Sequence, residues 1–284
     1  MFWQMIKIEQ TKIFKRTIFR SELVLLALAV TALYVIAYVV LSGDSSGQLP
    51  PESLQDSITW PTGLTGVLGI ASGPNLGGIL MIVLVGAFVA QEYTWSTLQL
   101  WLSRGVPRPF LILAKFTALL LPAFLFVLTA ALVGGVISAA FSLHLLGSIP
   151  FDQVAWGELG LNAVLIAYSL LPYAALTFFL AVLSRSTVAS IGGGLAYTLL
   201  MEGIVLQLIG TLGGFWGEIG RYLPGGLARG LLASEAGITV EVGDVSMATV
   251  RYFDPGAAAV GIALYLLVFI IASLLIFQRQ DLNS

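Results

Sequence analysis

The sequence predicts an all-α integral membrane protein with six transmembrane helices, and composition is the first reason. Of the 284 residues, 58% are hydrophobic and only 10% are charged, whereas about 25% of a typical soluble domain is charged. The mean hydropathy of +0.96 agrees. A helix needs ~20 apolar residues to cross the hydrocarbon core of a bilayer. Six windows free of Asp, Glu, Lys and Arg are that long or nearly so: 23–43, 57–91, 116–151, 159–184, 186–201 and 255–278.

These windows predict a single transmembrane domain over residues 1–284. The expected spans are about 23–43, 76–91, 116–141, 159–183, 187–209 and 256–277. The second window is broken by Gly73-Pro74-Asn75, so its crossing part should begin near residue 76, with 61–72 as a lead-in at the outer surface. Pro122 and Pro172 should kink the third and fourth spans. Such kinks can shape a cavity, but they also occur in membrane helices without a transport role.

The N-terminal arm, residues 1–21, has the pattern of an amphipathic helix. One side carries Trp3, Ile6, Gln10, Ile13 and Thr17. Another side groups Glu9, Lys12, Arg16 and Arg20. We expect this helix to lie on the inner membrane surface, with its apolar face toward acyl chains and its bases toward anionic lipid headgroups. Two interpretations stay open: an anchor that sets topology, or a contact with a cytoplasmic partner.

The connector between the second and third spans is polar and rich in tryptophan. It reads EYTWSTLQLWLSRGVPRPFLILAK from Glu92 to Lys115. If residues 92–103 are helical, one face carries Glu92, Ser96, Gln99 and Ser103. Another face carries Trp95, Leu98, Trp101 and Leu102. Such a helix should lie flat at the membrane surface.

An extracytoplasmic segment, 212–254, is expected before the last span. Residues 213–232 are rich in glycine and aromatic residues, which suggests one or two short helices, and the alternating pattern of 238–252 around Gly243-Asp244 predicts a small β-hairpin. Asp254-Pro255 has the signature of a helix start. Glu202 is the one ionisable residue inside a predicted span, and it either meets water where that helix ends or belongs to an outer gate.

The distribution of lysine and arginine predicts the orientation. Basic residues are retained on the cytoplasmic side. One side carries Lys7, Lys12, Lys15, Arg16, Arg20, Arg104, Arg108, Lys115, Arg185 and Arg279. The other side carries Arg221, Arg229 and Arg251. We therefore expect a multi-pass protein of the cell (plasma or inner) membrane with both termini in the cytoplasm, and the net charge of −2 gives no indication of a nucleic-acid partner.

Several catalytic signatures are missing from the sequence. None of the four lysines (Lys7, Lys12, Lys15 and Lys115) follows a glycine, so there is no G-x-x-x-x-G-K-[ST] loop to bind nucleotide phosphates. The chain has no cysteine and one histidine, His144, which argues against thiolate or histidine-built metal sites and against a catalytic triad. We expect no enzyme activity and no cofactor in this chain.

The connector resembles the cytoplasmic connector of the type-2 permease family of ABC transporters. That family has an acid, three residues, Gly-Thr-Leu, Pro-Val-Ser-Arg and then Lys. Here the order is Glu92, then Ser96-Thr97-Leu98, then Arg104-Gly105-Val106-Pro107-Arg108, then Lys115, with Ser96 in place of the family's glycine. The basic arm, six spans and the Arg185-Ser186 turn extend the resemblance over essentially the whole chain.

The resemblance implies the transmembrane subunit of an ATP-driven exporter. Such subunits form the translocation pathway as a homodimer, or a heterodimer with a second permease, and dock on two ATP-binding cassette subunits that hold ATP and Mg. By resemblance, 92–110 is the coupling segment. The residues implied in coupling are Glu92, Ser96, Gln99, Ser103, Arg104, Arg108, Lys115 and Arg185. An ion-coupled secondary transporter and a non-transporting membrane scaffold remain alternatives, and the substrate is not readable.

Overall fold

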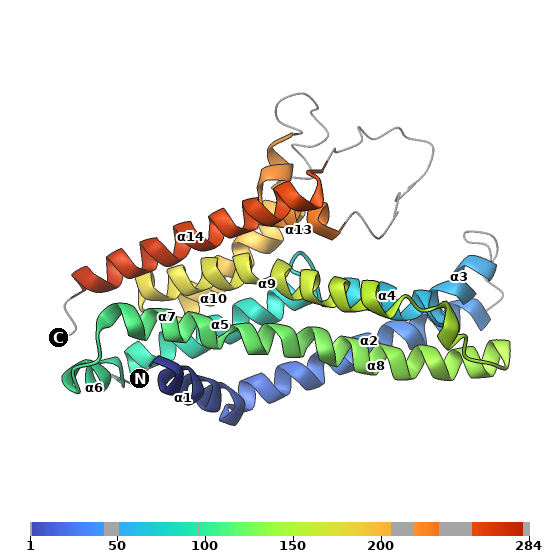
Figure 1. The fold of residues 1–284 in the computed structure, drawn as a ribbon, viewed down its shortest axis with the longest axis horizontal. Helices are drawn as coiled ribbons and strands as arrows, with labels where there is room; N and C mark the ends of the chain where they lie inside the picture. The colour runs from blue at the N-terminus through green and yellow to red at the C-terminus, as the bar shows by residue number, and fades with distance from the viewer. Residues whose placement is uncertain (1, 43–50, 96, 206–217, 233–251, 281–284) are drawn as a thin grey trace.

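The computed structural model describes residues 2–42, 51–95, 97–205, 218–232 and 252–280, which form an elongated bundle of helices (Figure 1). The first helix begins and the last helix ends at the same end of the bundle, beside α6 (Thr97–Ser103) and α7 (Arg108–Ala118). We call this the α6 end. The opposite end, which carries α3 (Pro51–Ile58), is the α3 end.

Five helices are long and apolar enough to span a membrane, which confirms the all-α, membrane-type architecture expected from composition. They are α2 (Thr17–Ser42), α5 (Leu76–Thr94), the α7–α8 pair (Arg108–Leu146, with α8 at Leu120–Leu146), α9 (Trp156–Ser184) and α14 (Pro255–Arg279). No strand occurs within the part of the chain that the structure describes.

The segment expected as a span at 187–209 has a different form. It is a short α-helix, α10 (Thr187–Ala196), that continues as the π-helix η2 (Tyr197–Val205). Residues 206–209 lie outside the described residues. A π-helix is rare and often marks a functional position, because it widens one turn and re-aims the side chains there.

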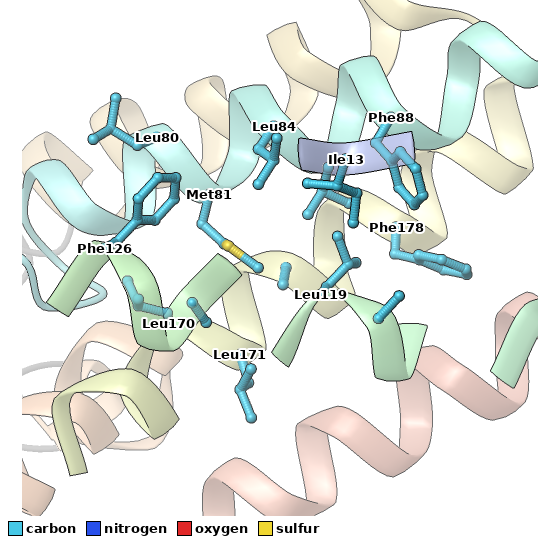
Figure 2. Close-up of a cluster of buried hydrophobic side chains, with 14 of the residues drawn as sticks. Ile13, Leu80, Met81, Leu84, Phe88, Leu119, Phe126, Leu170, Leu171 and Phe178 are labelled. Carbon is cyan, nitrogen blue, oxygen red and sulfur yellow. The ribbon is translucent and has the colours of Figure 1, made fainter. Parts of the chain in front are cut away.

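α5 is the central helix of the bundle. In its most apolar window 72% of the residues are buried, against 17% in the windows of α2 and α14. α2 and α14 therefore present mostly apolar side chains at the outside of the bundle. Figure 2 shows the core where α1, α5, α8 and α9 meet. It contains Ile13, Leu80, Met81, Leu84, Phe88, Leu119, Phe126, Leu170, Leu171 and Phe178.

α1 (Phe2–Lys15) corrects the expectation for the N-terminal arm. Its apolar residues Ile6 and Ile13 are buried and the helix packs against α7, so this face contacts protein rather than acyl chains. Trp3, from the same predicted row, is 75% exposed. The charged side is not directed wholly at headgroups either, because Glu9 is buried.

The turn between α4 and α5 packs closely against α9. α4 (Thr62–Ile70) ends before the turn at Gly73-Pro74-Asn75, and α5 starts at Leu76. The backbone N–H of Gly73 donates to Ser169 Oγ at 3.0 Å, and a Cβ on Gly73 would lie 2.1 Å from the Ser169 backbone oxygen. Only glycine fits between this turn and α9.

The two expected proline kinks differ. α9 runs as one helix through Pro172. The third span is interrupted at Leu119, between α7 and α8, and Pro122 follows in the first turn of α8. A proline is tolerated in a first turn because the N–H that it lacks has no partner there in any case.

Between η2 and α14, the described residues form short helical elements rather than a long helix. η3 (Gly220–Tyr222) and α13 (Pro224–Leu232) lead toward α14. α14 begins as expected, with Asp254 Oδ2 accepting a hydrogen bond from the Ala257 N–H at 3.2 Å. The predicted hairpin lies, up to residue 251, outside the described residues. The remaining short element, the 3-10 helix η1 (Phe151–Gln153), links α8 to α9.

Candidate coupling site

The connector expected to be helical from Glu92 to Ser103 is divided. α5 continues to Thr94, so Glu92 belongs to the last turn of a membrane helix and not to the first turn of a surface helix. α6 starts only at Thr97. Gln99 lies in α6, and Ser96 falls outside the described residues. The predicted polar face is therefore not one continuous helical face.

Four charged side chains from three helices form a closed ring near the α6 end. Lys115 Nζ lies 2.7 Å from Glu9 Oε2 and 2.5 Å from Glu92 Oε2. Lys12 Nζ lies 2.6 Å from Glu9 Oε1 and 3.1 Å from Glu92 Oε1. α1 supplies Glu9 and Lys12, α5 supplies Glu92, and α7 supplies Lys115. We call these four residues the charge cluster.

The charge cluster is almost fully buried. The side chains of Glu9 and Glu92 are 2% exposed and that of Lys115 is 1% exposed, while Lys12 is 30% exposed. Two acids and two bases cancel, and each carboxylate oxygen faces an ammonium group. A buried ion pair adds little net stability over apolar residues, but removing one partner strands a buried charge at a cost of about 3–5 kcal/mol. The cluster therefore fixes where α1 sits on α5 and α7.

Lys12 is the most exposed member of the charge cluster, and Arg16 lies beside it on Ala87 and Gln91. Burial lowers the pKa of Lys12, but the carboxylates of Glu9 and Glu92 outweigh this and raise the pKa above its ordinary value. Arg16 Nη1 donates to Gln91 Oε1 at 2.8 Å and to the Ala87 carbonyl at 2.9 Å. Burial lowers the pKa of Arg16, but a guanidinium remains protonated in proteins.

Aromatic contacts tie the connector to these cations. Lys12 Nζ lies 5.2 Å from the ring centroid of Trp101 in α6, and Arg16 Cζ lies 5.3 Å from that of Trp95. Both distances are within the range of cation–π attraction. Leu98 is buried, whereas Ser103 and Arg104 are exposed. α6 is thus held against the bundle through Leu98 and Trp101, whereas its last residue, Ser103, and the following Arg104 are solvent-exposed.

A second polar group joins four helix ends. Arg108 Nη1, from the start of α7, donates to the carbonyls of Phe277 at 3.1 Å and Gln278 at 2.7 Å in the last turn of α14, and to that of Gln280, the residue after the helix, at 3.0 Å. A cation at a helix C-terminus satisfies free carbonyls and opposes the helix dipole. Gln280 in turn donates to the Val182 carbonyl of α9 at 2.7 Å and accepts from the Tyr93 hydroxyl of α5 at 3.2 Å. We call Arg108, Gln280 and these partners the α14 bracket.

Arg185 lies near the α14 bracket, where its charge acts on the hydroxyl group of Tyr93. It follows α9 in the left-handed conformation with φ of 53°, its N–H donates to the Ala181 carbonyl at 3.0 Å, and its side chain is exposed. Of the predicted coupling residues, the structure therefore brings together Glu92 and Lys115. It uses Arg108 to cap α14 and leaves Arg104 and Arg185 at the surface.

Three residues of the site were missed by sequence reasoning. Glu9 and Lys12 were assigned to a headgroup-facing surface, although their spacing of three already allowed an ion pair within one helix turn. Their pairing with Glu92 and Lys115 spans 80 to 106 residues and left no local signal. Gln280 offered only its polarity directly after the last span.

A model of the family described as "Protein of unknown function (DUF2705)" matches residues 77–283. The chain belongs to the DUF2705 family. No curated protein matches it. The matched part of this DUF2705 protein starts at α5, so the charge cluster joins Glu92 and Lys115, inside the match, to Glu9 and Lys12, outside it. The α14 bracket lies wholly inside the match.

Glu202 lies at a different site of the DUF2705 protein. It belongs to the π-helix η2, and its Oε2 accepts from the hydroxyl of Tyr173 in α9 at 2.6 Å. Its Oε1 accepts from the backbone N–H of Gly225 in the first turn of α13 at 2.8 Å. An acidic group at a helix N-terminus is stabilised by the helix dipole. Glu202 thus fastens α13 to α9 and η2.

The described residues of the DUF2705 protein contain no group of three or more His, Cys, Asp or Glu side chains placed to hold a metal ion. In the charge cluster and the α14 bracket, the polar groups form ion pairs and hydrogen bonds that fix the positions of the helices they join.

Proposed function

We propose that the protein is the transmembrane subunit of an ATP-driven exporter that works with separate ATP-binding subunits. The observation that supports this proposal most directly is the way α6 is attached to the bundle. This short helix projects at the end of the bundle, and the residues behind it are tied to α1, α5 and α7 by the buried charge cluster. A push on α6 would pass to these helices as a unit, since a buried ion-pair ring tolerates little relative movement.

The α14 bracket extends the same argument. Arg108 follows α6 closely in the chain and holds the end of α14, while Gln280 reaches α9 and Tyr93 of α5. A displacement of the connector would therefore also be transmitted to α14 and α9. An exporter subunit needs such a link, because ATP is consumed outside the membrane and the substrate passes within it.

The proposal includes six spans and a cytoplasmic α6 end. The sixth span is α10 with η2, a continuous helical run from Thr187 to Val205. The excess of lysine and arginine near the α6 end supports a cytoplasmic location for both termini. Two copies, or one copy and a second permease, would pair, and two ATP-binding subunits would supply ATP and Mg. In this arrangement the contact of Glu202 with α9 and α13 would lie on the outer side of the membrane and is a candidate outer gate.

Reconstitution with ATP-binding subunits recovered from the source membranes tests the proposal. Purified alone, the chain should show no ATP hydrolysis; with the subunits, hydrolysis should appear and depend on α6. Arg104→Glu reverses an exposed charge beside α6 and should weaken this association. The matched control is Asp152→Arg, which reverses an exposed charge in η1, beyond the opposite end of α8. It should not weaken this association. The proposal fails if no ATP-binding subunit copurifies, or if both variants bind the subunit as well as wild type.

A further inference from the structure

Glu22 is a buried acid that neither the charge cluster nor the α14 bracket uses. Because α2 begins at Thr17, Glu22 lies inside a membrane-spanning helix, so Glu202 is not the only ionisable residue in the spans. Glu22 is 4% exposed. Neither of its carboxylate oxygens has a hydrogen-bond partner among the described residues. It differs in this from the buried acids Glu9 and Glu92, which are ion-paired.

Helix contacts place Glu22 deep within the bundle. Its face of α2 packs on α8, with the ring of Phe19 5.9 Å from that of Phe126 and the Tyr34 hydroxyl donating to the Gly134 carbonyl at 3.2 Å. Phe126 follows Lys115 by eleven residues, and eleven residues of helix rise ~16 Å. Glu22 therefore lies about half a bilayer away from the charge cluster, since the hydrocarbon core is ~30 Å thick.

Among the described residues, no counter-charge is bonded to Glu22. α2 packs against α8, α5, α1 and α3. The described titratable side chains of these helices are His144 in α8, Glu92 and Tyr93 in α5, Lys7, Glu9, Lys12 and Lys15 in α1, and Asp56 in α3, and α2 itself adds Tyr34 and Tyr38. None of them forms a hydrogen bond with Glu22. On α2 itself the side chain of Arg20 donates to the Phe14 carbonyl, and that of Arg16, just before α2, points to Ala87 and Gln91.

We infer that Glu22 is a proton-binding site inside the membrane. An ionised carboxylate that is buried without a partner costs far more than a neutral acid, so the acid form fits this position. A metal cation would need several further oxygen ligands, and none of the described polar groups is bonded to Glu22. The proton is the one ligand that a single carboxyl can hold.

The bound proton is linked to the packing of α2. While α2 is packed on α8, the Glu22 carboxyl stays protonated and neutral. A movement that admits water between α2 and α8 lets this carboxyl ionise and release its proton. Proton release and separation of α2 from α8 are therefore one coupled event. This inference stands without the exporter assignment, because it rests only on burial and on the absence of partners for Glu22.

Infrared spectroscopy of the purified protein in lipid nanodiscs tests the inference. At neutral pH, Glu22→Gln should remove the carbonyl-stretching band of a protonated carboxylic acid, and this band should shift in deuterated water. Asp56→Asn, at an exposed position in α3, is the control and should remove carboxylate bands instead. Loss of carboxylate bands in Glu22→Gln would overturn the inference.

A second measurement does not depend on spectral assignment. A free glutamate ionises above pH ~4.3, so above that pH the unfolded chain releases a proton that the folded protein keeps. As pH rises, the unfolding equilibrium constant of wild type should increase relative to that of Glu22→Gln by up to about tenfold per pH unit. A ratio that stays constant between acidic and neutral pH would equally overturn the proton site.

Discussion

Lys115 Nζ and Glu9 Oε2 lie 2.7 Å apart, although 106 residues separate them in the chain. This ion pair joins the N-terminal helix α1 to α7, in which the connector ends, and Glu92 completes the link to the central helix α5. The connector is thus bounded at both ends by residues of one buried cluster. In the proposed exporter, α6 would pass the movement of an ATP-binding subunit to the helices that this cluster joins.

Replacing Lys115 should destabilise the protein strongly. Lys115→Met keeps much of the side-chain volume but leaves Glu9 and Glu92 with only the half-buried Lys12, so the free energy of unfolding should fall by about 3–5 kcal/mol. Equilibrium denaturation in detergent micelles measures this change in the free energy of unfolding. Lys7→Met, at an exposed position in the same N-terminal helix, should change stability by less than ~0.5 kcal/mol. Equal small losses for both variants would show that the cluster does not hold α1.

Removing Arg108 should loosen the last turn of α14. Arg108→Ala withdraws the donor from three carbonyls, and the net loss should be about 1–3 kcal/mol for bonds made by a charged group. Hydrogen exchange of peptides that end near Gln280 should speed up, with little change elsewhere. Arg104→Ala, four residues earlier and exposed, serves as control. Unchanged exchange in Arg108→Ala would mean that Gln280 alone secures this end.

Sequence reasoning succeeded where the signal is local. The long charge-free windows correctly predicted the long helices. Gly73-Pro74-Asn75 predicted the turn before Leu76, and Asp254-Pro255 predicted the start of α14. Each signal acts within a few residues, because apolar length, proline geometry and capping need no distant partner.

The site could be predicted only in part for the opposite reason. Glu92 and Lys115 were singled out, but as surface residues. Whether they are buried depends on α1, which folds back and supplies Glu9 and Lys12. Helical periodicity cannot separate a face that meets lipid from one that meets another helix, since both are apolar. Glu22 escaped notice because the first span begins at Thr17 rather than at residue 23.

Cysteine accessibility should establish which end of the bundle faces the cytoplasm. The chain has no cysteine, so single substitutions report cleanly. α7 and α8 together cover 39 residues, about 58 Å of helix, between the regions of Arg104 and Asp152, which is enough to cross the bilayer. In intact cells Arg104→Cys should be protected from impermeant thiol reagents and Asp152→Cys should be labelled. The reverse pattern would invert the proposed topology.

Adding one methyl group at Gly225 should disturb the Glu202 contact. A Cβ there would lie 2.6 Å from Glu202 Oε2, so Gly225→Ala must push the carboxylate away from the Gly225 N–H and from Tyr173. Steric crowding of this kind typically costs 1–3 kcal/mol, and hydrogen exchange in α13 should rise.

Gly157→Ala is the matched control for this experiment. Its Cβ would meet nothing within 4 Å, and it lies in the first turn of a long helix, where alanine is favoured over glycine. It should therefore leave stability unchanged or raise it slightly. If Gly225→Ala behaves in the same way, α13 is not fastened by Glu202, and a role for this carboxylate in an outer gate loses its structural basis. If exchange rises only in Gly225→Ala, the contact between Glu202 of η2 and Gly225 is what fastens α13 to the bundle.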